Sequence, residues 1–214
     1  KKNSYFIKRV IELDKSQPEF KLTLNQYLNK VVTKKRINKA VKLYFKNKVI
    51  LDKISKFYKI QPRFIIALWG IETDFGRVTG SFPVISSLMT LIYDGRRANY
   101  FEKELFYALD IIKDGHVKMK NMYGSWAGAM GQCQFMPSSF IKYAQDWNKD
   151  GKKDIWKTKG DVFASAANYL KNTGWNNKEN WGRKVYLKNV KSKINSKSKF
   201  ELGYFEKLGA LNNP

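Results

Sequence analysis

The sequence contains a single cysteine and a single histidine among its 214 residues. Cys133 alone excludes an intrachain disulfide and any metal site built from several cysteines. His116 alone excludes catalytic machinery built from several histidines. The chemistry of this chain must therefore rest mainly on carboxylates, hydroxyls, amides and arginines.

Long hydrophobic runs are also missing. No apolar stretch approaches the roughly 18 to 20 residues that cross a membrane. The N-terminal sequence KKNSYFIKRV lacks the apolar core of a signal peptide. We expect the chain to be soluble as given, with a leader already removed.

Acidic residues are scarce, because 41 Lys and Arg face only 18 Asp and Glu, a formal net charge of +23. Such a charge predicts attraction to nucleic acid, an anionic membrane or an acidic cell-wall polymer. The sequence shows no paired Cys/His zinc ligands, no basic region followed by heptads and no Gly-Phe-rich strand motif. We therefore expect no nucleic-acid partner. The lysines of KKRINKAVKLYFKNK are spaced as on the solvated face of a helix.

The residues that are present indicate a globular, mainly α chain. Hydrophobic residues make up 43% of it and aromatic residues 15%, enough for a sizeable core. Apolar spacing predicts three helices, through Phe20, Leu24, Tyr27, Leu28, Val31 and Val32, then Ile37, Val41, Tyr44 and Phe45, then Leu51, Ile54 and Phe57. A fourth helix is predicted from Pro62, which suits a first turn, to near Gly76.

Two further helices are predicted C-terminal to these. One covers residues 97–113, with apolar positions at Tyr100, Phe101, Leu105, Ala108, Leu109 and Ile112, and the other covers VFASAANYL. Strand-like alternation is scarce before RKVYLKNV, near Arg183. We therefore expect a mainly α domain over residues 1–175 and a small α/β tail, rich in Lys and Asn, over residues 176–214.

Glu72 ends the apolar run RFIIALWGIETDFG, where a carboxylate is costly unless it is paired, neutral or useful. The negative end of the helix dipole and the apolar neighbours both favour its protonated form. A neutral carboxyl in a cleft can act as the general acid of glycoside cleavage. Asp74 lies two residues on, a poor position for a second carboxylate. Taken alone, Glu72 fits equally a surface residue at a helix end or a salt-bridge partner.

The segment GSWAGAMGQCQFMPSSF, from Gly124, breaks the helical rhythm. Its glycines allow close backbone approach, and its serines and glutamines supply neutral hydrogen-bonding groups. This mixture suits a polar neutral ligand such as a sugar. It suits equally a tightly packed turn whose serines cap the next helix.

The segment DWNKDGKKDIW places Asp146, Asn148, Asp150, Lys152 and Asp154 at positions 1, 3, 5, 7 and 9 of an EF-hand pattern. Oxygens at alternate loop positions can converge on one hard cation, with position 7 supplied by the Lys152 carbonyl. Position 12, normally Glu, is Lys157. Asp161 can supply the missing carboxylate, or it can cap the following helix. We favour a structural calcium ion over an ion-free Asp/Asn/Gly turn.

Five motifs, GIETDFGR, GRRANYF, GSWAGAMGQCQFMPSS, DWNKDGKKDIW and ASAANYL, occur in an order and at separations that resemble the membrane-bound lytic murein transglycosylase B family. The similarity covers most of residues 10–175, and LDKSQPEF resembles the family's start. The resemblance implies a lysozyme-like, mainly α fold with an EF-hand-like calcium loop and no organic cofactor. It implies cleavage of the MurNAc to GlcNAc β-1,4 bond of peptidoglycan without water, leaving 1,6-anhydro-MurNAc ends.

The resemblance also assigns residues. It places the family's single catalytic glutamate on Glu72, acting first as acid and then as base. It implies sugar or peptide contacts for Arg96, Arg97, Tyr100, Ser125, Gln134 and Tyr169. The implied partners are peptidoglycan glycan strands and proteins of cell-wall synthesis or remodelling, and the implied location is the bacterial periplasm or cell envelope. We expect a monomer.

Two features depart from the family pattern. Cys133 stands where the family commonly has a small residue or proline. The chain also ends at Pro214 without the Arg-Tyr-Asn-like motif of the family's C-terminal segment, so we expect residues 176–214 to be a truncated form of that segment. Three alternatives stay open: a hydrolytic lysozyme, a non-catalytic peptidoglycan-binding module, and a peptidase or amidase built on Cys133 and His116.

Overall fold

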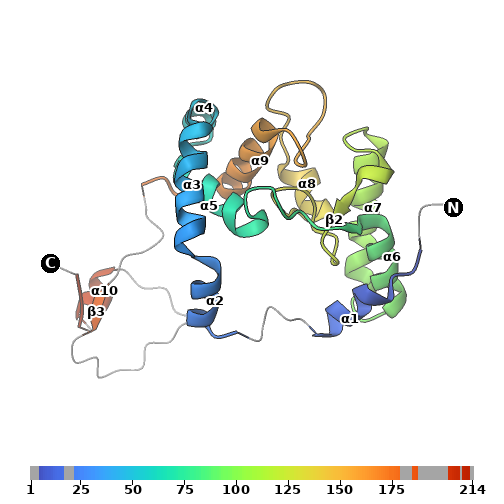
Figure 1. Ribbon diagram of the computed structural model, residues 1–214, viewed down its shortest axis with the longest axis horizontal. Helices are drawn as coiled ribbons and strands as arrows, with labels where there is room; N and C mark the ends of the chain where they lie inside the picture. The colour runs from blue at the N-terminus through green and yellow to red at the C-terminus, as the bar shows by residue number, and fades with distance from the viewer. Residues whose placement is uncertain (1–4, 17–21, 179–184, 188–201, 208, 213–214) are drawn as a thin grey trace. The chain divides into compact units, whose positions relative to one another are not determined.

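The computed structural model describes residues 5–16, 22–178, 185–187, 202–207 and 209–212 (Figure 1). The chain divides into two compact units, Lys1–Trp175 and Asn176–Pro214. The described residues are mainly helical, which confirms the predicted fold class. None of their helices is long and apolar enough to cross a membrane.

The helices of the first unit are α1 (Lys8–Ser16), α2 (Leu24–Val31), α3 (Lys34–Lys46), α4 (Lys48–Tyr58), α5 (Pro62–Thr73), α6 (Val84–Asp94), α7 (Ala98–Lys113), α8 (Pro137–Tyr143) and α9 (Lys159–Asn172). A 3-10 helix covers Met119–Asn121. The short strands β1 (Phe82–Pro83) and β2 (Tyr123–Gly124) pair antiparallel, with Phe82 opposite Gly124.

The second unit contains β3 (Val185–Leu187), α10 (Leu202–Lys207) and β4 (Ala210–Asn212). The two strands pair antiparallel, with Tyr186 opposite Leu211. β3 lies within the segment RKVYLKNV, where the sequence shows strand-like alternation.

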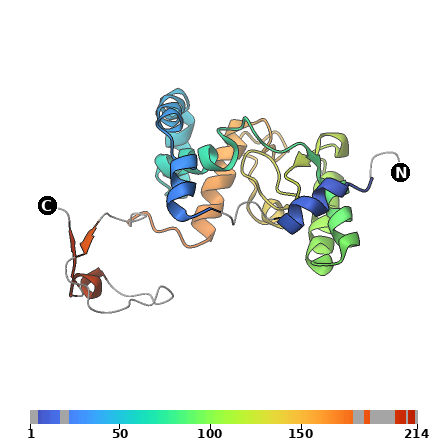
Figure 2. The same cartoon turned by 60° about the horizontal axis from the view of Figure 1, so that its bottom comes forward.

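Two hydrophobic clusters organise the first unit, and Figures 1 and 2 show the helices that carry them as two groups. One cluster joins α4, α5 and α9 through buried residues such as Leu51, Ile65 and Phe163. The other joins α6, α7 and α8 through Leu88, Phe101 and Phe140. Cys133 packs against both clusters, so the segment GSWAGAMGQCQFMPSSF (residues 124–140, the glycine-rich segment) lies between them.

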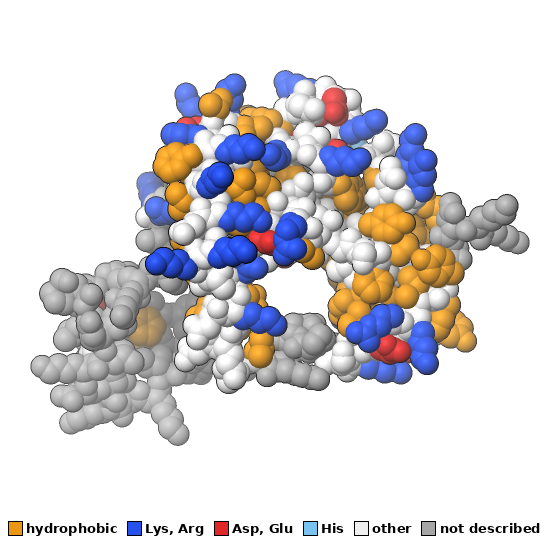
Figure 3. Space-filling view, in the orientation of Figure 1, with side chains coloured by type: hydrophobic (Ala, Val, Ile, Leu, Met, Phe, Trp, Pro, Cys, Tyr) orange, Lys and Arg blue, Asp and Glu red, His pale blue; other side chains and the backbone are white. Residues whose placement is uncertain are grey.

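The outward face of α3 differs from the sequence prediction. Of the predicted stripe, Tyr44 packs against the core, together with Leu43, but Ile37, Val41 and Phe45 are exposed. Lys and Arg side chains gather over this part of the molecule, with hydrophobic side chains among them (Figure 3). Apolar side chains therefore occur on two faces of α3, and only one of these faces packs against the core.

Other helix ends follow local capping. α2 begins at Leu24 because Thr23 and Gln26 form a capping box, and the predicted start at Phe20 lies outside the described residues. α9 leads to Trp175, whose ring lies 4.3 Å from that of Phe64 and whose Nε1–H donates to Gln61 Oε1 at 3.0 Å. These contacts fix the end of the first unit against the start of α5.

Candidate active site

A cavity of about 190 Å³ opens between α5, α9 and the glycine-rich segment. Its wall is mostly apolar, with a few polar side chains. It is lined by Ile65, Leu68, Trp69, Glu72, Gln132, Cys133, Gln134, Phe135, Met136, Ser139, Val162, Phe163, Ala166 and Tyr169. A concave, largely apolar site with few convergent polar groups is typical of ligand binding.

Glu72 enters this cavity from the last turn of α5. Pro62 occupies the first turn, as predicted, and buried side chains on one face, among them Ile65, Ile66 and Trp69, hold the helix in the core. Glu72 remains solvent-accessible as a residue, yet burial of its carboxyl in the cavity raises its pKa above the ordinary value. A carboxyl at the mouth of a cleft can belong to an exposed residue and still have a raised pKa. The upward direction of the pKa shift agrees with the sequence prediction.

The chain leaves α5 through a strained turn. Asp74 and Phe75 both have positive φ, 49° and 63°, a conformation that costs roughly 1 to 3 kcal/mol for a non-glycine residue. Phe75 folds back onto Trp69, with ring centroids 5.5 Å apart, and a Cβ on Gly70 would lie 2.7 Å from its ring. The helix therefore ends before Gly76, and the strain lies beside Glu72.

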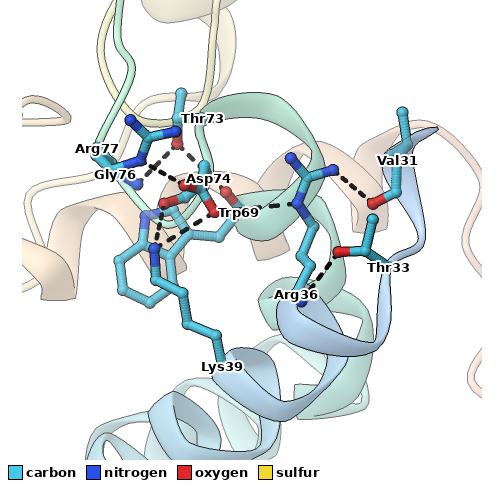
Figure 4. A network of polar contacts seen from close by, with 9 residues as sticks. All are labelled: Val31, Thr33, Arg36, Lys39, Trp69, Thr73, Asp74, Gly76 and Arg77. Carbon is cyan, nitrogen blue, oxygen red and sulfur yellow. Dashed lines mark hydrogen bonds and ion pairs between the residues drawn. The ribbon is translucent and has the colours of Figure 1, made fainter.

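Ion pairs hold this turn in place (Figure 4). Asp74 contacts Arg77 Nε at 2.5 Å, Lys39 Nζ at 3.3 Å and Arg36 Nε at 3.9 Å. The hydrogen bond from Arg77, with the bond and charge of Lys39, lowers the pKa of Asp74. Asp74 is thus a structural anion that ties α5 to α3, as its poor placement for catalysis predicts.

Among the described residues that line the cavity, Glu72 is the only acidic one. Glycosidases that activate water use two carboxyl groups on opposite sides of the scissile bond. The described wall of this cavity therefore holds one carboxyl group with a raised pKa and lacks the second carboxyl of such an enzyme.

The structure brings two of the predicted contact residues, Gln134 and Tyr169, to the same cavity as Glu72. Gln134 has a φ of 49°, and its Nε2 donates to the carbonyls of Thr79 and Gly131 at 3.1 and 2.9 Å. Its Oε1 accepts no hydrogen bond from the described residues. Tyr169 packs against Phe135, with ring centroids 5.6 Å apart. Both side chains can contact a ligand that reaches Glu72.

The other four predicted contacts do not line this cavity. Arg96 and Arg97 both bind Asp14 of α1, with Arg96 Nε at 2.8 Å and Arg97 Nη2 at 2.5 Å. Tyr100 is exposed on α7, and Ser125 Oγ accepts the Ala129 N–H at 3.0 Å. The two arginines thus have an ion-pair partner that the sequence did not reveal.

Several lining residues were missed by the sequence reasoning, notably Trp69, Phe163 and Ser139. Trp69 and Phe163 read as core from their apolar helices, and their ring centroids lie 5.1 Å apart. The GSWAGAMGQCQFMPSSF composition was the only signal for Ser139. The serines do not cap α8, because Met136 is its N-cap and Glu104 accepts the Ser138 N–H and hydroxyl instead.

The peptidase alternative is wrong, because the structure separates its two residues. Cys133 lines the cavity, and its thiol donates to the Val162 carbonyl at 3.3 Å. His116 does not line it; its Nδ1 accepts the Lys153 N–H at 3.3 Å and its ring packs on Phe140. Burial, reinforced by the charge of Glu72, raises the pKa of the Cys133 thiol far above the ordinary value.

We therefore expect Cys133→Ser to keep any activity of this cavity within a few-fold of the parent, because the thiol is protonated and serves in packing. Native Cys133 should react slowly with a maleimide at mildly alkaline pH, and rapidly once the protein is unfolded in denaturant. Loss of activity as deep as that of a Glu72 variant would contradict a packing role.

The predicted metal loop is closed by hydrogen bonds from backbone N–H groups. Asp146 accepts from Gly151 at 2.8 Å, Asp150 from Lys152 at 2.9 Å, and the buried Asp161 from Trp147 and Asp154 at 2.9 and 2.8 Å. Asp161 is not the helix cap, because α9 begins after Thr158. Among the described residues, no three His, Cys, Asp or Glu side chains are grouped to hold a metal ion.

Burial raises the pKa of Asp161, and the negative charges of Asp146 and Asp150 add to this effect. The negative charges of Asp146 and Asp150 thus disfavour the ionised form of Asp161, an effect that a bound cation would relieve. The donor set, which consists of carboxylate, amide and carbonyl oxygens, is the set that Ca²⁺ prefers.

Comparison with known proteins places this chain in a family. Residues 2–211 match the family described as Transglycosylase SLT domain. Over 151 residues, 70% of the chain, the sequence is 36% identical to membrane-bound lytic murein transglycosylase B of Escherichia coli strain K12. The match covers 42% of that relative, so the chain spans less than half of its length.

Solved structures agree with the sequence match. SltB3 from Pseudomonas aeruginosa in complex with NAG-NAM-pentapeptide is 36% identical, with a TM-score of 0.93 over 99% of this chain and 58% of that chain. The Escherichia coli lytic transglycosylase Slt35 in complex with calcium is 30% identical, with a TM-score of 0.82 over 96% of this chain and 66% of that chain.

Proposed function

This chain belongs to the Transglycosylase SLT domain family, and from that membership we propose that it is a lytic transglycosylase that cleaves the β-1,4 bond between MurNAc and GlcNAc in peptidoglycan. The observation that carries the proposal is the single carboxyl in the cavity. Glu72 has a raised pKa and no acidic neighbour in the described wall, which suits a reaction in which the substrate supplies its own nucleophile.

In the first step, Glu72 acts as general acid. Its protonated carboxyl donates to the glycosidic oxygen, the bond from that oxygen to C1 of MurNAc breaks, and GlcNAc leaves with a new 4-hydroxyl. Positive charge develops on C1 and the ring oxygen. The apolar wall formed by Trp69, Phe135 and Phe163 keeps the carboxyl protonated before the step and limits access of water.

In the second step, the same carboxylate acts as base. It takes the proton of the MurNAc 6-hydroxyl as that oxygen attacks C1, which forms the 1,6-anhydro bond and returns Glu72 to its starting form. The attack is intramolecular, so it has the advantage of high effective concentration over water. One carboxyl and one substrate hydroxyl complete the cycle.

Substrate contacts are proposed in two groups. Gln134 and Tyr169 lie in the wall beside Glu72, where an amide can bond acetamido or hydroxyl groups and a ring can cover a sugar face. Ser125, Tyr100, Arg96 and Arg97 would contact more distant sugars or stem peptides. Because the two arginines share one carboxylate, a positive charge is left over to attract stem-peptide carboxylates.

Glycan strands as substrate agree with the NAG-NAM-pentapeptide bound to SltB3. The net charge of +23 favours an acidic wall polymer. We therefore place the protein in the bacterial cell envelope, with the periplasm as its compartment, and count proteins of wall synthesis or remodelling among its partners.

The function is tested by incubating the purified protein with purified sacculi. The proposal predicts release of soluble glycan fragments by the parent protein and none by Glu72→Gln. Binding to sacculi without release would instead indicate a non-catalytic wall-binding module.

We also propose that Ca²⁺ binds the Asp146 loop as a structural ion. The side chains of Asp146, Asn148, Asp150 and Asp161 and the carbonyl of Lys152 would hold it, and the calcium bound to Slt35 supports the choice of ion. Its role is to offset the negative charges of Asp146 and Asp150 that act on Asp161 in the first turn of α9, a helix that supplies part of the cavity wall.

Calcium should therefore raise the melting temperature by binding only the folded state, by an amount that grows with concentration. Asp150→Ala should abolish this rise, while Asp110→Ala, which removes an exposed carboxylate from α7, should leave it intact. Thermal unfolding with and without a chelator measures the effect. Absence of any calcium-dependent shift or binding heat in the parent protein would exclude the site.

A further inference from the structure

Gln132 is buried in the cavity wall, and each of its polar groups has a partner in another segment. Its Oε1 accepts the Trp69 Nε1–H at 2.7 Å, and its Nε2 donates to the Trp156 carbonyl at 2.7 Å. Its backbone N–H donates to the Ile155 carbonyl at 2.8 Å, and its carbonyl accepts the Thr73 hydroxyl at 3.1 Å. Gln132 thus joins α5 to Ile155 and Trp156, at the end of the segment DWNKDGKKDIW.

The chemistry of these partners requires an amide at position 132. An indole N–H is only a donor, and a backbone carbonyl is only an acceptor, so the side chain between them must present one acceptor and one donor. The orientation of the Gln132 amide follows from its partners. An ionised carboxylate lacks the donor, and an apolar side chain lacks both.

The backbone is shaped to admit this residue. Gly76 has a φ of +78°, and a Cβ there would lie 2.2 Å from Gln132 Oε1. Gly131 has a φ of +64°, and a Cβ there would lie 2.6 Å from Ile155 Cγ1 and 2.8 Å from its carbonyl oxygen. Neither position can carry a side chain without displacing the contact that Gln132 makes.

These bonds converge on the helix end that carries Glu72. Trp69 lies nearly one turn before Glu72, and Thr73 follows it directly. The Thr73 hydroxyl is bonded further to the Trp69 carbonyl and the Gly76 N–H, at 3.2 and 3.0 Å. Gln132 therefore fixes this end of α5 from the side of the cavity wall.

We propose that Gln132 is a positioning residue, which holds the Glu72 carboxyl at its place against the cavity wall without touching the substrate itself. The catalytic half of this inference rests on the proposed function; the structural half does not. Both polar atoms of the Gln132 side chain, Oε1 and Nε2, already bind partners within the protein, which gives the side chain a structural role in this wall.

The kinetic test compares Gln132→Met, Gln132→Glu and a matched control, Gln145→Met. Gln145 is a half-buried glutamine whose amide also binds on both sides, accepting from Tyr58 and donating to the Ala144 carbonyl, but it lies outside the cavity. Gln132→Met should lower kcat at least roughly tenfold with KM little changed, because a small displacement of Glu72 slows chemistry more than binding. The control should lose stability but keep its kcat.

The pH profile separates positioning from simple loss of packing. A protonated carboxyl has one donor and one acceptor, so the kcat of Gln132→Glu relative to the parent should recover as the pH falls. The same ratio for Gln132→Met should stay flat. A raised KM with unchanged kcat would overturn the proposal in favour of substrate contact, and a kcat loss no greater than that of Gln145→Met would reduce Gln132 to a packing residue.

A titration of Glu72 by carboxyl-carbon NMR tests the inference even if the parent cleaves nothing. Gln132→Met should shift the pKa of Glu72 toward the ordinary value, because a displaced wall admits water, and Gln145→Met should leave it unchanged. An unchanged Glu72 titration in Gln132→Met would overturn the proposal. An inactive parent with the expected shift would contradict the proposed function alone.

Discussion

Glu72→Gln should cut peptidoglycan cleavage at least roughly 100-fold, the lower range for loss of acid–base catalysis. Glutamine keeps the shape of the side chain but cannot supply the transferable proton. The variant should still sediment with sacculi, because the walls that Gln134 and Tyr169 provide are unchanged. Glu102→Gln, the same exchange at an exposed position of α7, should leave turnover unaffected.

Glu72→Gln should also be slightly more stable than the parent protein at neutral pH. The folded-state pKa of Glu72 is raised, so the folded protein holds this proton more tightly than the unfolded chain, and stability falls as the pH rises through the interval between the two pKa values. Glutamine removes that cost, and the gain should shrink on acidification. A variant that lost activity together with stability would point to misfolding instead of lost chemistry.

The second large effect is expected at Asp14, a buried carboxylate that binds Arg96 and Arg97. Asp14→Asn should lower the free energy of unfolding by about 2 kcal/mol, because it removes the buried counter-charge that the two guanidinium groups share. In a chain of this size that corresponds to a fall in melting temperature of roughly 4 to 8 °C. Glu12→Gln, which breaks an exposed pair with Arg9 on the same helix, should cost little.

The Asp14 effect should also depend on pH. Burial alone would raise the pKa of Asp14, but the hydrogen bonds and charges of Arg96 and Arg97 outweigh burial and lower it. A lowered folded-state pKa contributes stability above the unfolded-state value, which is lost as the pH falls through the folded-state value. The parent and Asp14→Asn should therefore converge in stability at acidic pH. Equal melting temperatures at neutral pH would contradict the ion-pair role.

Features set by neighbouring residues could be predicted from the sequence. Pro62 and the apolar run that follows it define α5, and the end of that run places Glu72 in the last turn. The direction of its pKa shift could also be predicted, although the burial that causes it comes from a cavity that distant residues complete. The five ordered motifs indicated the family, which the matched residues and the related structures confirm.

Features that depend on distant residues could not be predicted. Gln132 meets Trp69 across 63 positions and Arg96 meets Asp14 across 82, so spacing alone gave no signal for either contact. Arg96 and Arg97 were predicted to bind substrate carboxylates because the sequence does not show that Asp14 is their partner within the protein. Helix α6 was not predicted either. Ser86, Ser87 and Thr90 are buried together with its apolar residues, so its sequence does not show the separate polar and apolar faces of an amphipathic helix.

Mass spectrometry of peptidoglycan digested by the purified parent protein would show whether Glu72 works alone, with a substrate hydroxyl as nucleophile. We expect fragments whose terminal MurNAc has lost one water relative to a reducing end, because the 6-hydroxyl displaces the glycosidic bond. Fragments with reducing MurNAc ends would contradict it and identify a hydrolase.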